Sequence, residues 1–286
     1  MLSDAFLRKL DLMNLMLSRP AQGGSGARRS KAQGGSVEFS DFRDYAQGDD
    51  LRRVDWNAAA RFDKLFVKLF LDERRTLISI VLDASASMAL EKEKWAAAQN
   101  MALLTAYLAL RGGDTVRLLA LNADGILECG TLNTRQDFLK AARFLSSLDS
   151  GHGRAQPAQL IPQISFVARG ACVLVSDFLF EDGYERALRA LVFKHQETFA
   201  VQVLSGGELS PELEGAVRLI DSETNAAMEY EAGPHALAEY RRALDAFLTD
   251  FASFSTRMAI PHALIDARND FEQTALNTLA HAGLVR

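Results

Sequence analysis

Short apolar runs alternate with amphipathic helical patterns along most of the chain, from residue 76 to the C-terminus. The runs are rich in β-branched residues, which is typical of strands covered on both faces of a sheet. They predict strands at 76–82, 116–121, 125–129, 171–177, 198–204 and 259–264, with a β-hairpin at 216–221 and 227–230. The intervening patterns predict helices at 93–110, 134–148, 155–167, 183–195, 234–256 and 270–283. This alternation predicts an α/β fold with a doubly wound, mostly parallel sheet.

The pattern before residue 76 is different and predicts three shorter segments. Residues 1–19 carry apolar positions at roughly helical spacing and predict an N-terminal helix. Residues 20–36, PAQGGSGARRSKAQGGS, predict a flexible loop without the GxxxxGK[ST] spacing of a phosphate loop. Residues 37–75 are dense in aromatic side chains and include a predicted strand at 65–70. We expect them to form a smaller extension that contains β structure and packs on the main domain, residues 76–286.

Length, charge and cysteine content narrow the function classes. The 286 residues, of which 48% are hydrophobic, suffice for one large domain with a smaller appendage. The net charge of -5 is too small to favour nucleic acid as a partner. No apolar run reaches about 18 residues, so no membrane span is expected, and the N-terminus lacks the apolar core of a signal peptide. Two widely spaced cysteines indicate neither a disulfide framework nor a zinc site, and together these features favour a cytoplasmic protein.

Two acidic loops follow two of the predicted strands. Asp83, Ser85 and Ser87 come after the strand at 76–82, and Asp177 ends the strand at 171–177. Open α/β sheets form their sites at the carboxyl ends of strands, and alternate residues leaving a strand present side chains to one point. Carboxylate and hydroxyl oxygens suit Mg²⁺ or Mn²⁺, and few carboxylates would leave the ion free to take an outside acid. Helix N-capping is the alternative role for these Asp and Ser residues.

Two stretches of sequence resemble known families. The pattern V-L-D-A-S-A-S-M, followed later by V-L-V-S-D-F, resembles the metal-ion-dependent adhesion site of von Willebrand factor A domains. The block Y-A-Q-G-D-D-L-R-R-V-D-W, residues 45–56, resembles the signature of the bacterial family catalogued as "domain of unknown function 58", and this likeness extends over roughly residues 20–286. It implies a von Willebrand factor A-like fold and an association with AAA+ ATPases of the MoxR type, which mature or remodel other proteins. It also implies that Asp83, Ser85, Ser87 and Asp177 hold the metal.

One departure from the adhesion pattern concerns the third metal loop. Where such domains bring a Thr to the metal, this chain has Arg154. A cation there would repel Mg²⁺ and attract carboxylates. Two alternatives follow: weak metal binding, or occupation of the site by Arg154 as an internal substitute for the ion.

The signature block itself has two interpretations. Paired acids and bases beside aromatic residues predict a structural ion-pair network that clamps the segment onto the main domain. A recruitment surface for a partner is the alternative. The residues concerned are Tyr45, Asp49, Asp50, Arg52, Asp55, Trp56 and Arg61.

These observations favour a non-enzymatic protein-interaction module. The first hypothesis is that it binds a partner's carboxylate through the metal site and works with a MoxR-type AAA+ ATPase in protein assembly or remodelling. The second is a scaffold with a degenerate, metal-free site that binds partners through other surfaces. A metal-dependent hydrolase with Asp83 as nucleophile is disfavoured, because Ser85 stands where a haloacid-dehalogenase-like site has its second Asp.

Overall fold

The structure, a computed structural model, divides into two compact units, each described by itself. The first comprises residues 1–20 and 76–286, and the second comprises residues 21–75. The description covers residues 2–17, 38–62, 64–71, 75–148, 155–167, 170–180, 182–211, 215–220 and 227–286.

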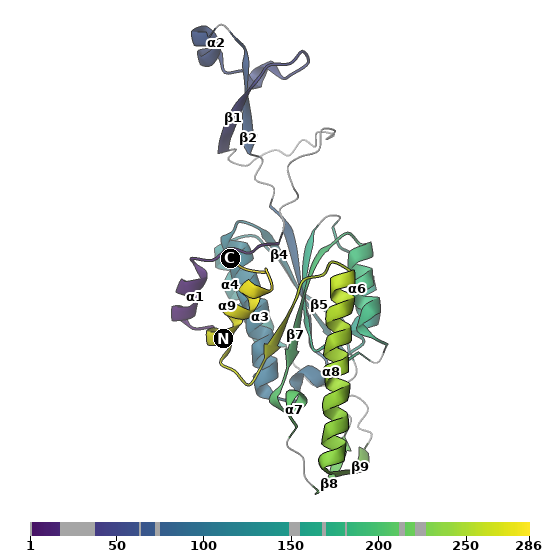
Figure 1. Cartoon of the computed structure of the whole chain (residues 1–286). Helices are drawn as coiled ribbons and strands as arrows, with labels where there is room; N and C mark the ends of the chain where they lie inside the picture. The colour runs from purple at the N-terminus through teal and green to yellow at the C-terminus, as the bar shows by residue number, and fades with distance from the viewer. Residues whose placement is uncertain are drawn as a thin grey trace. The chain divides into compact units, whose positions relative to one another are not determined.

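A six-stranded sheet in the order β10-β7-β6-β3-β4-β5 forms the centre of the first unit (Figure 1). Its neighbours pair in parallel, except that β4 and β5 are antiparallel. The strands are β3 (Leu77–Asp83), β4 (Thr115–Asn122), β5 (Gly125–Leu132), β6 (Ala171–Ser176), β7 (Glu197–Leu204) and β10 (His262–Asp266). This mostly parallel α/β sheet confirms the predicted fold class and is consistent with a von Willebrand factor A-like fold.

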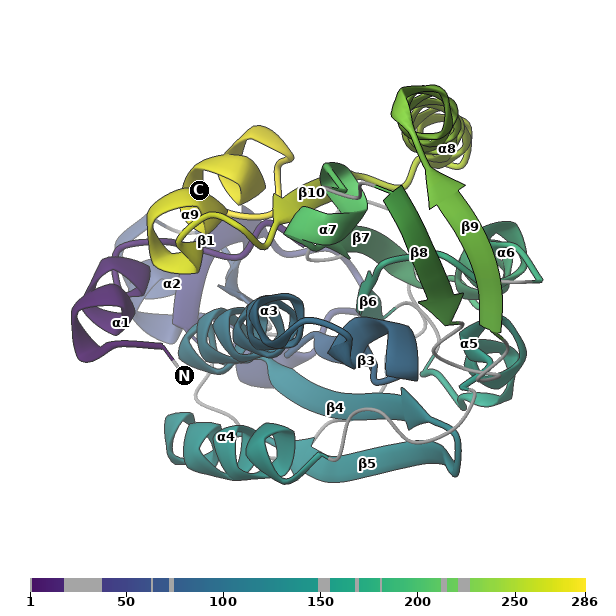
Figure 2. The ribbon, with the colours of Figure 1, turned by 90° about the horizontal axis from the view of Figure 1, so that it is seen from below.

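Helices cover both faces of the sheet (Figure 2). Along β3, Ile78, Ile80 and Leu82 enter one apolar core, whereas Val81 enters the other. The first core is completed by α1 (Asp4–Leu10), α3 (Lys92–Arg111), α4 (Phe138–Ser147) and α9 (Phe271–His281). The second is completed by α5 (Pro157–Leu160), α6 (Tyr184–Phe193) and α8 (Pro234–Arg257). Burial on both faces explains why β3, β6 and β7 are nearly continuous apolar runs in the sequence.

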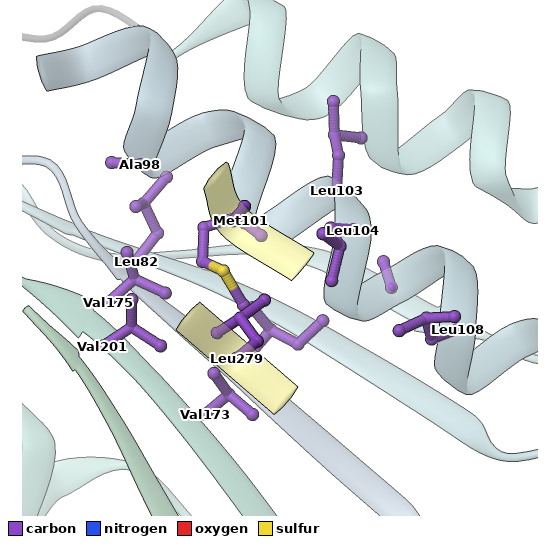
Figure 3. Close-up of a cluster of buried hydrophobic side chains, with 14 of the residues drawn as sticks. Leu82, Ala98, Met101, Leu103, Leu104, Leu108, Val173, Val175, Val201 and Leu279 are labelled. Atoms are coloured by element: carbon purple, nitrogen blue, oxygen red, sulfur yellow. The ribbon is translucent and has the colours of Figure 1, made fainter. Parts of the chain in front are cut away.

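Helix α3 is the centre of the first core. Figure 3 shows its side chains gathered with those of the sheet and of α9, among them Met101, Val173 and Leu279. These three side chains are fully buried. The packing fixes the rotation of α3 and therefore the direction of every side chain near its N-terminus.

Two predicted helices are shorter in the structure. The N-terminal helix predicted over 1–19 covers only Asp4–Leu10, because Leu15 forms an antiparallel bridge with Val285 and is extended there. The helix predicted over 155–167 was wrong in extent. The chain forms only α5 and a 3₁₀ turn at Ile161–Gln163, and the backbone becomes extended at Ile164. Pro162 has no N–H to donate to the carbonyl four residues before it, which prevents a regular α-helix from continuing through this segment.

Three smaller features complete the first unit. A one-turn helix, α7 (Gly206–Leu209), follows β7, and the predicted hairpin is present as antiparallel β8 (Gly215–Ile220) and β9 (Ala227–Ala232). Cys129 and Cys172 are both free thiols. Among the helices in the described part of the chain, none combines the length and apolarity that a membrane crossing requires.

The second unit contains the β structure predicted for the N-terminal extension. Strand β1 (Glu38–Asp44) pairs antiparallel with β2 (Phe66–Leu71). Between them lie a 3₁₀ turn (Leu51–Arg53) and a short helix, α2 (Trp56–Phe62), which the sequence patterns had not indicated. The packing of this extension on the main domain stays a prediction, and the loop predicted at 20–36 lies outside the described residues.

Candidate functional site

The two predicted acidic loops lie at the point where the strand order of the sheet reverses. Asp83 is the last residue of β3 and Asp177 directly follows β6, and these two strands are parallel neighbours. The crevice at such a reversal is where doubly wound sheets bind their ligands. Asp83 is 0% exposed and Asp177 is 1% exposed, so both carboxylates lie beneath the surface of this edge.

Hydrogen bonds organise the oxygens of the first loop. Asp83 Oδ1 accepts from the Ser85 N–H at 3.0 Å, and Asp83 Oδ2 accepts from Ser176 Oγ at 2.6 Å. The hydroxyl oxygens of Ser85 and Ser87 lie 3.0 Å apart and share a hydrogen bond. The spacing Asp83-x-Ser85-x-Ser87 therefore does bring its side chains to one place.

The buried surroundings of Asp83 disfavour the charged form of its carboxyl group. Its pKa is raised to about 6, mainly by burial and also by the charge of nearby Asp177. Hydrogen bonds from Ser176 and Ser85 act in the opposite direction. The carboxyl group is thus ionised at neutral pH at a cost to the folded state.

The second loop turns sharply after β6. Phe178 has φ of 62°, a left-handed conformation that is unusual for an aromatic residue. Its ring is buried and lies 4.7 Å from that of Phe251 between centroids. The turn lets the Leu179 N–H donate to Asp177 Oδ1 at 3.0 Å. Packing of the Phe178 ring therefore stabilises a strained backbone that positions Asp177.

A buried lysine from α3 completes the site. Lys94 is 0% exposed, and its Nζ donates to Asp177 Oδ2 at 2.8 Å, to Glu208 Oε1 at 2.6 Å and to the Ser87 carbonyl at 3.2 Å. Burial lowers the pKa of Lys94, but the charges of Asp177 and Glu208 outweigh burial and hold it above its usual value. Lys94 is therefore a charged ammonium between two carboxylates.

Helix α7 contributes the second of these carboxylates. Ser205 and Glu208 form a capping box, in which Glu208 Oε2 accepts from the Ser205 N–H at 2.7 Å. Glu91, just before α3, accepts from Ser205 Oγ at 2.6 Å and from the Gly207 N–H at 3.2 Å. The Tyr240 hydroxyl of α8 donates to the Glu208 carbonyl at 2.6 Å. These bonds hold α7 against the start of α3.

This arrangement does not fit a divalent metal ion. The oxygens of Asp83, Ser85 and Ser87 are suitable donors, but both oxygens of Asp177 are already bonded, one of them to the Lys94 ammonium. A divalent ion on Asp177 would lie beside that positive charge.

Sequence reasoning missed Lys94, Glu91 and Glu208. Arg154, the cation that the sequence suggested as an internal substitute, lies outside the described residues. A signal for Lys94 was present: it lies at helical spacing from Ala98 and Met101, on the buried stripe of α3. Lysine is rarely buried without a partner, so its position on that stripe indicated a buried acid nearby.

The acids of the signature block have local structural roles in the second unit. Asp49 accepts two hydrogen bonds from Arg43, at 2.7 and 2.6 Å. Asp50 caps the 3₁₀ turn through the Arg52 N–H, and Asp55 accepts from the N–H groups of Asn57 and Ala58 at the start of α2. The remaining residues of the block are exposed or half-buried: Tyr45, Arg52, Trp56 and Arg61.

A comparison with known proteins identifies a family that this chain matches. A family model described as "Protein of unknown function DUF58" matches residues 41–247. Uncharacterized proteins of Mycobacterium bovis and Mycobacterium tuberculosis are each 28% identical over 228 residues, which are 77% of this chain and 71% of each relative.

Two solved structures are also similar. One is a conserved hypothetical protein BatB from Bacteroides thetaiotaomicron, with a TM-score of 0.41, 16% identity, and coverage of 72% of this chain and 98% of that one. The other is an aerotolerance-related membrane protein from Bacteroides fragilis, with a TM-score of 0.40, 17% identity, and coverage of 73% and 98%.

Proposed function

The chain belongs to the family described as "Protein of unknown function DUF58", and from that premise we propose that it is a non-enzymatic protein-interaction module. Its partner in this proposal is a AAA+ ATPase of the MoxR type, and its process is the assembly or remodelling of other proteins. The resemblance of residues 45–56 to the family signature suggests this partner. The carboxyl edge of the sheet is the face that we assign to the contact.

One observation carries the proposal: the charged side chains at this edge are buried and bonded within the chain, whereas apolar side chains at the same edge are exposed. Asp83, Asp177 and Lys94 are each at most 1% exposed and bonded within the chain. A buried, bonded carboxylate is poorly placed to attack a substrate, which argues against the hydrolase hypothesis. Leu90 is 62% exposed and Leu179 is 49% exposed, on the two loops that leave β3 and β6. Exposed apolar side chains on two neighbouring loops at the carboxyl edge of a sheet suit a protein partner.

The sequence suggested two forms of partner contact, and the hydrogen bonds and ion pairs of this site favour one of them. Capture of a partner's carboxylate through Mg²⁺ or Mn²⁺ requires an accessible ion on Asp83, Ser85, Ser87 and Asp177. The ion pair between Lys94 and Asp177 favours the other form, a metal-free scaffold. We therefore assign the contact to the exposed leucines of the edge.

A matched pair of variants tests this proposal. Leu90 and Leu139 are 62% and 63% exposed, but Leu139 lies on α4, away from the loops that follow β3 and β6. The purified MoxR-type ATPase of the same organism is captured on the immobilised chain with ATP present. We expect Leu90→Ser to weaken capture by about ten-fold and Leu139→Ser to leave it unchanged. Equal capture by both variants, or no capture by the wild type, would contradict the proposal.

A further inference from the structure

A buried positive charge already lies against Asp177, one of the carboxylates that the sequence predicts to bind a metal cation. The three N–H donors of the Lys94 ammonium are all used, by Asp177, Glu208 and the Ser87 carbonyl. A lysine ammonium has no further donor. Lys94 therefore has no free donor to offer to an incoming ligand.

We propose that Lys94 and Glu208 close this site from within. The ammonium of Lys94 supplies the positive charge that the predicted divalent ion was to supply, and the carboxylate of Glu208 takes the role predicted for a partner's carboxylate. The site then needs neither a metal nor an outside acid. This inference deepens the proposed function by excluding one kind of contact, and it rests on that function only for the identity of the partner.

The charges around Lys94 explain why one ammonium belongs there. Asp177 is bonded to it directly, Asp83 lies near enough to Asp177 for the two charges to interact, and Glu208 approaches from α7. Three acids beneath or at the edge of the surface would repel one another without a cation. Lys94 relieves this repulsion as part of the folded chain.

Hydrogen bonds from several parts of the chain fix the position of Glu208. Its carboxylate is fixed by the Ser205 N–H, and its helix is held by Glu91 and by the Tyr240 hydroxyl. At Gly207 an added Cβ would lie 2.6 Å from Glu91 Oε1. Only glycine allows the backbone of α7 to approach Glu91 this closely without displacing that carboxylate. A carboxylate that is already held on several sides loses little conformational entropy when it binds the ammonium.

Thermal unfolding of the whole chain with and without divalent ions tests the inference. After treatment with EDTA, the wild type, Lys94→Met and Lys140→Met are melted with and without millimolar Mg²⁺ or Mn²⁺. Lys140 is the matched control, because its side chain is 68% exposed and pairs with Asp137 at the surface. Any ion that binds the folded state raises the Tm.

The expected results differ for the three proteins. The wild type and Lys140→Met show no shift in Tm with either ion. Lys94→Met melts lower by on the order of 10 °C, because unpaired acids remain buried, and regains part of this loss when Mg²⁺ or Mn²⁺ is added. Glu208→Gln, which removes the charge of the second acid and replaces one of its two accepting oxygens with an amide donor, melts lower than the wild type.

Three outcomes overturn the inference: a rise in the wild-type Tm with Mg²⁺ or Mn²⁺, a folded Lys94→Met that melts no lower than Lys140→Met, or a folded Lys94→Met that ignores both ions. If Lys94→Met does not fold, calorimetric titration of the wild type with Mg²⁺ decides alone, since measurable binding overturns the inference and its absence supports it. None of these measurements uses the ATPase. A failure to capture the ATPase therefore contradicts the proposed function and leaves this inference standing.

Discussion

At the scale of single residues, Asp83 shows the cost of gathering acids under a surface. Its pKa is raised to about 6, so the folded chain holds this proton more tightly than the unfolded chain does. For a carboxyl whose pKa is raised, the contribution to stability is largest at acid pH and is lost as the pH rises through the folded value. Asp83 therefore destabilises the fold at neutral pH. The Lys94 ammonium does not remove this penalty, because it bonds to Asp177 rather than to Asp83.

Asp83→Asn should remove this penalty. We expect the free energy of unfolding of the variant, relative to wild type, to increase between pH 4 and pH 7 by at most about 3 kcal/mol. Asparagine keeps the shape and can still accept the Ser85 N–H, but its amide nitrogen replaces the oxygen that accepts from Ser176. The change of the difference with pH, rather than its absolute size, therefore reports the charge. Urea unfolding at several pH values measures the difference. A difference that stays constant across this range would contradict the assignment of the raised pKa to Asp83.

The residues of the site differ in how far sequence could predict them. Asp83, Ser85 and Asp177 were predictable, because each lies at the end of an apolar strand and the carboxyl ends of neighbouring parallel strands meet. Lys94 and Glu208 were not recognised, because their meeting depends on the rotation of α3 and on the path of the chain after β7. Both are set by packing between elements that are far apart in sequence.

At the scale of elements, α7 is a single turn whose position depends on side chains from other elements. A helix of this length has almost no intrinsic stability. Its capping box, the bonds to Glu91 and the bond from Tyr240 replace the missing helical bonds. The attachment of α7 is thus the part of the site that a small change at Gly207 should loosen first.

Gly207→Ala should displace Glu91 and release α7. The new Cβ would lie 2.6 Å from Glu91 Oε1, and the movement of Glu91 would break its bonds to Ser205 Oγ and the Gly207 N–H. We expect a loss of about 1–3 kcal/mol in the free energy of unfolding and faster hydrogen exchange at α7. Gly233→Ala is the control, because a Cβ there meets no atom within 4 Å. Unchanged exchange at α7 in Gly207→Ala would show that Glu91 does not hold it.

The elements that were predicted well from the sequence are those whose apolar pattern reflects which side chains are buried. The strands of the main sheet are apolar because both of their faces are covered, and α3 and α8 are long enough for their periodicity to be recognised. The segment at 155–167 was predicted as one helix from its apolar spacing alone, and the effect of Pro162 was missed. The short α2, Trp56–Phe62, was missed because a helix of two turns carries little periodicity.

At the scale of the whole molecule, the second unit interrupts the first in sequence. Residues 1–20 belong to the same unit as residues 76–286. Asn14 exchanges backbone hydrogen bonds with Arg286, and Arg111 of α3 donates to the carbonyls of Asp11 and Met13. No local pattern could predict this, since the partners of the N-terminal segment lie at the far end of the chain. The signature block is therefore a separate unit carried by a main domain that includes both chain ends.

This separation makes the role of the signature block testable with one side chain. Its acids cap local turns and α2, so the second unit is stabilised from within, whereas Trp56 is 61% exposed. An exposed Trp contributes little to stability but is among the side chains that dominate protein interfaces. If the block recruits the ATPase in addition to the leucines of the sheet edge, Trp56→Ala weakens capture of the ATPase by about ten-fold with no change in Tm. Phe193→Ala, at a side chain of α6 that is 84% exposed, should change neither. A fall in the Tm of Trp56→Ala without a loss of capture would instead give Trp56 a structural role and contradict recruitment through it.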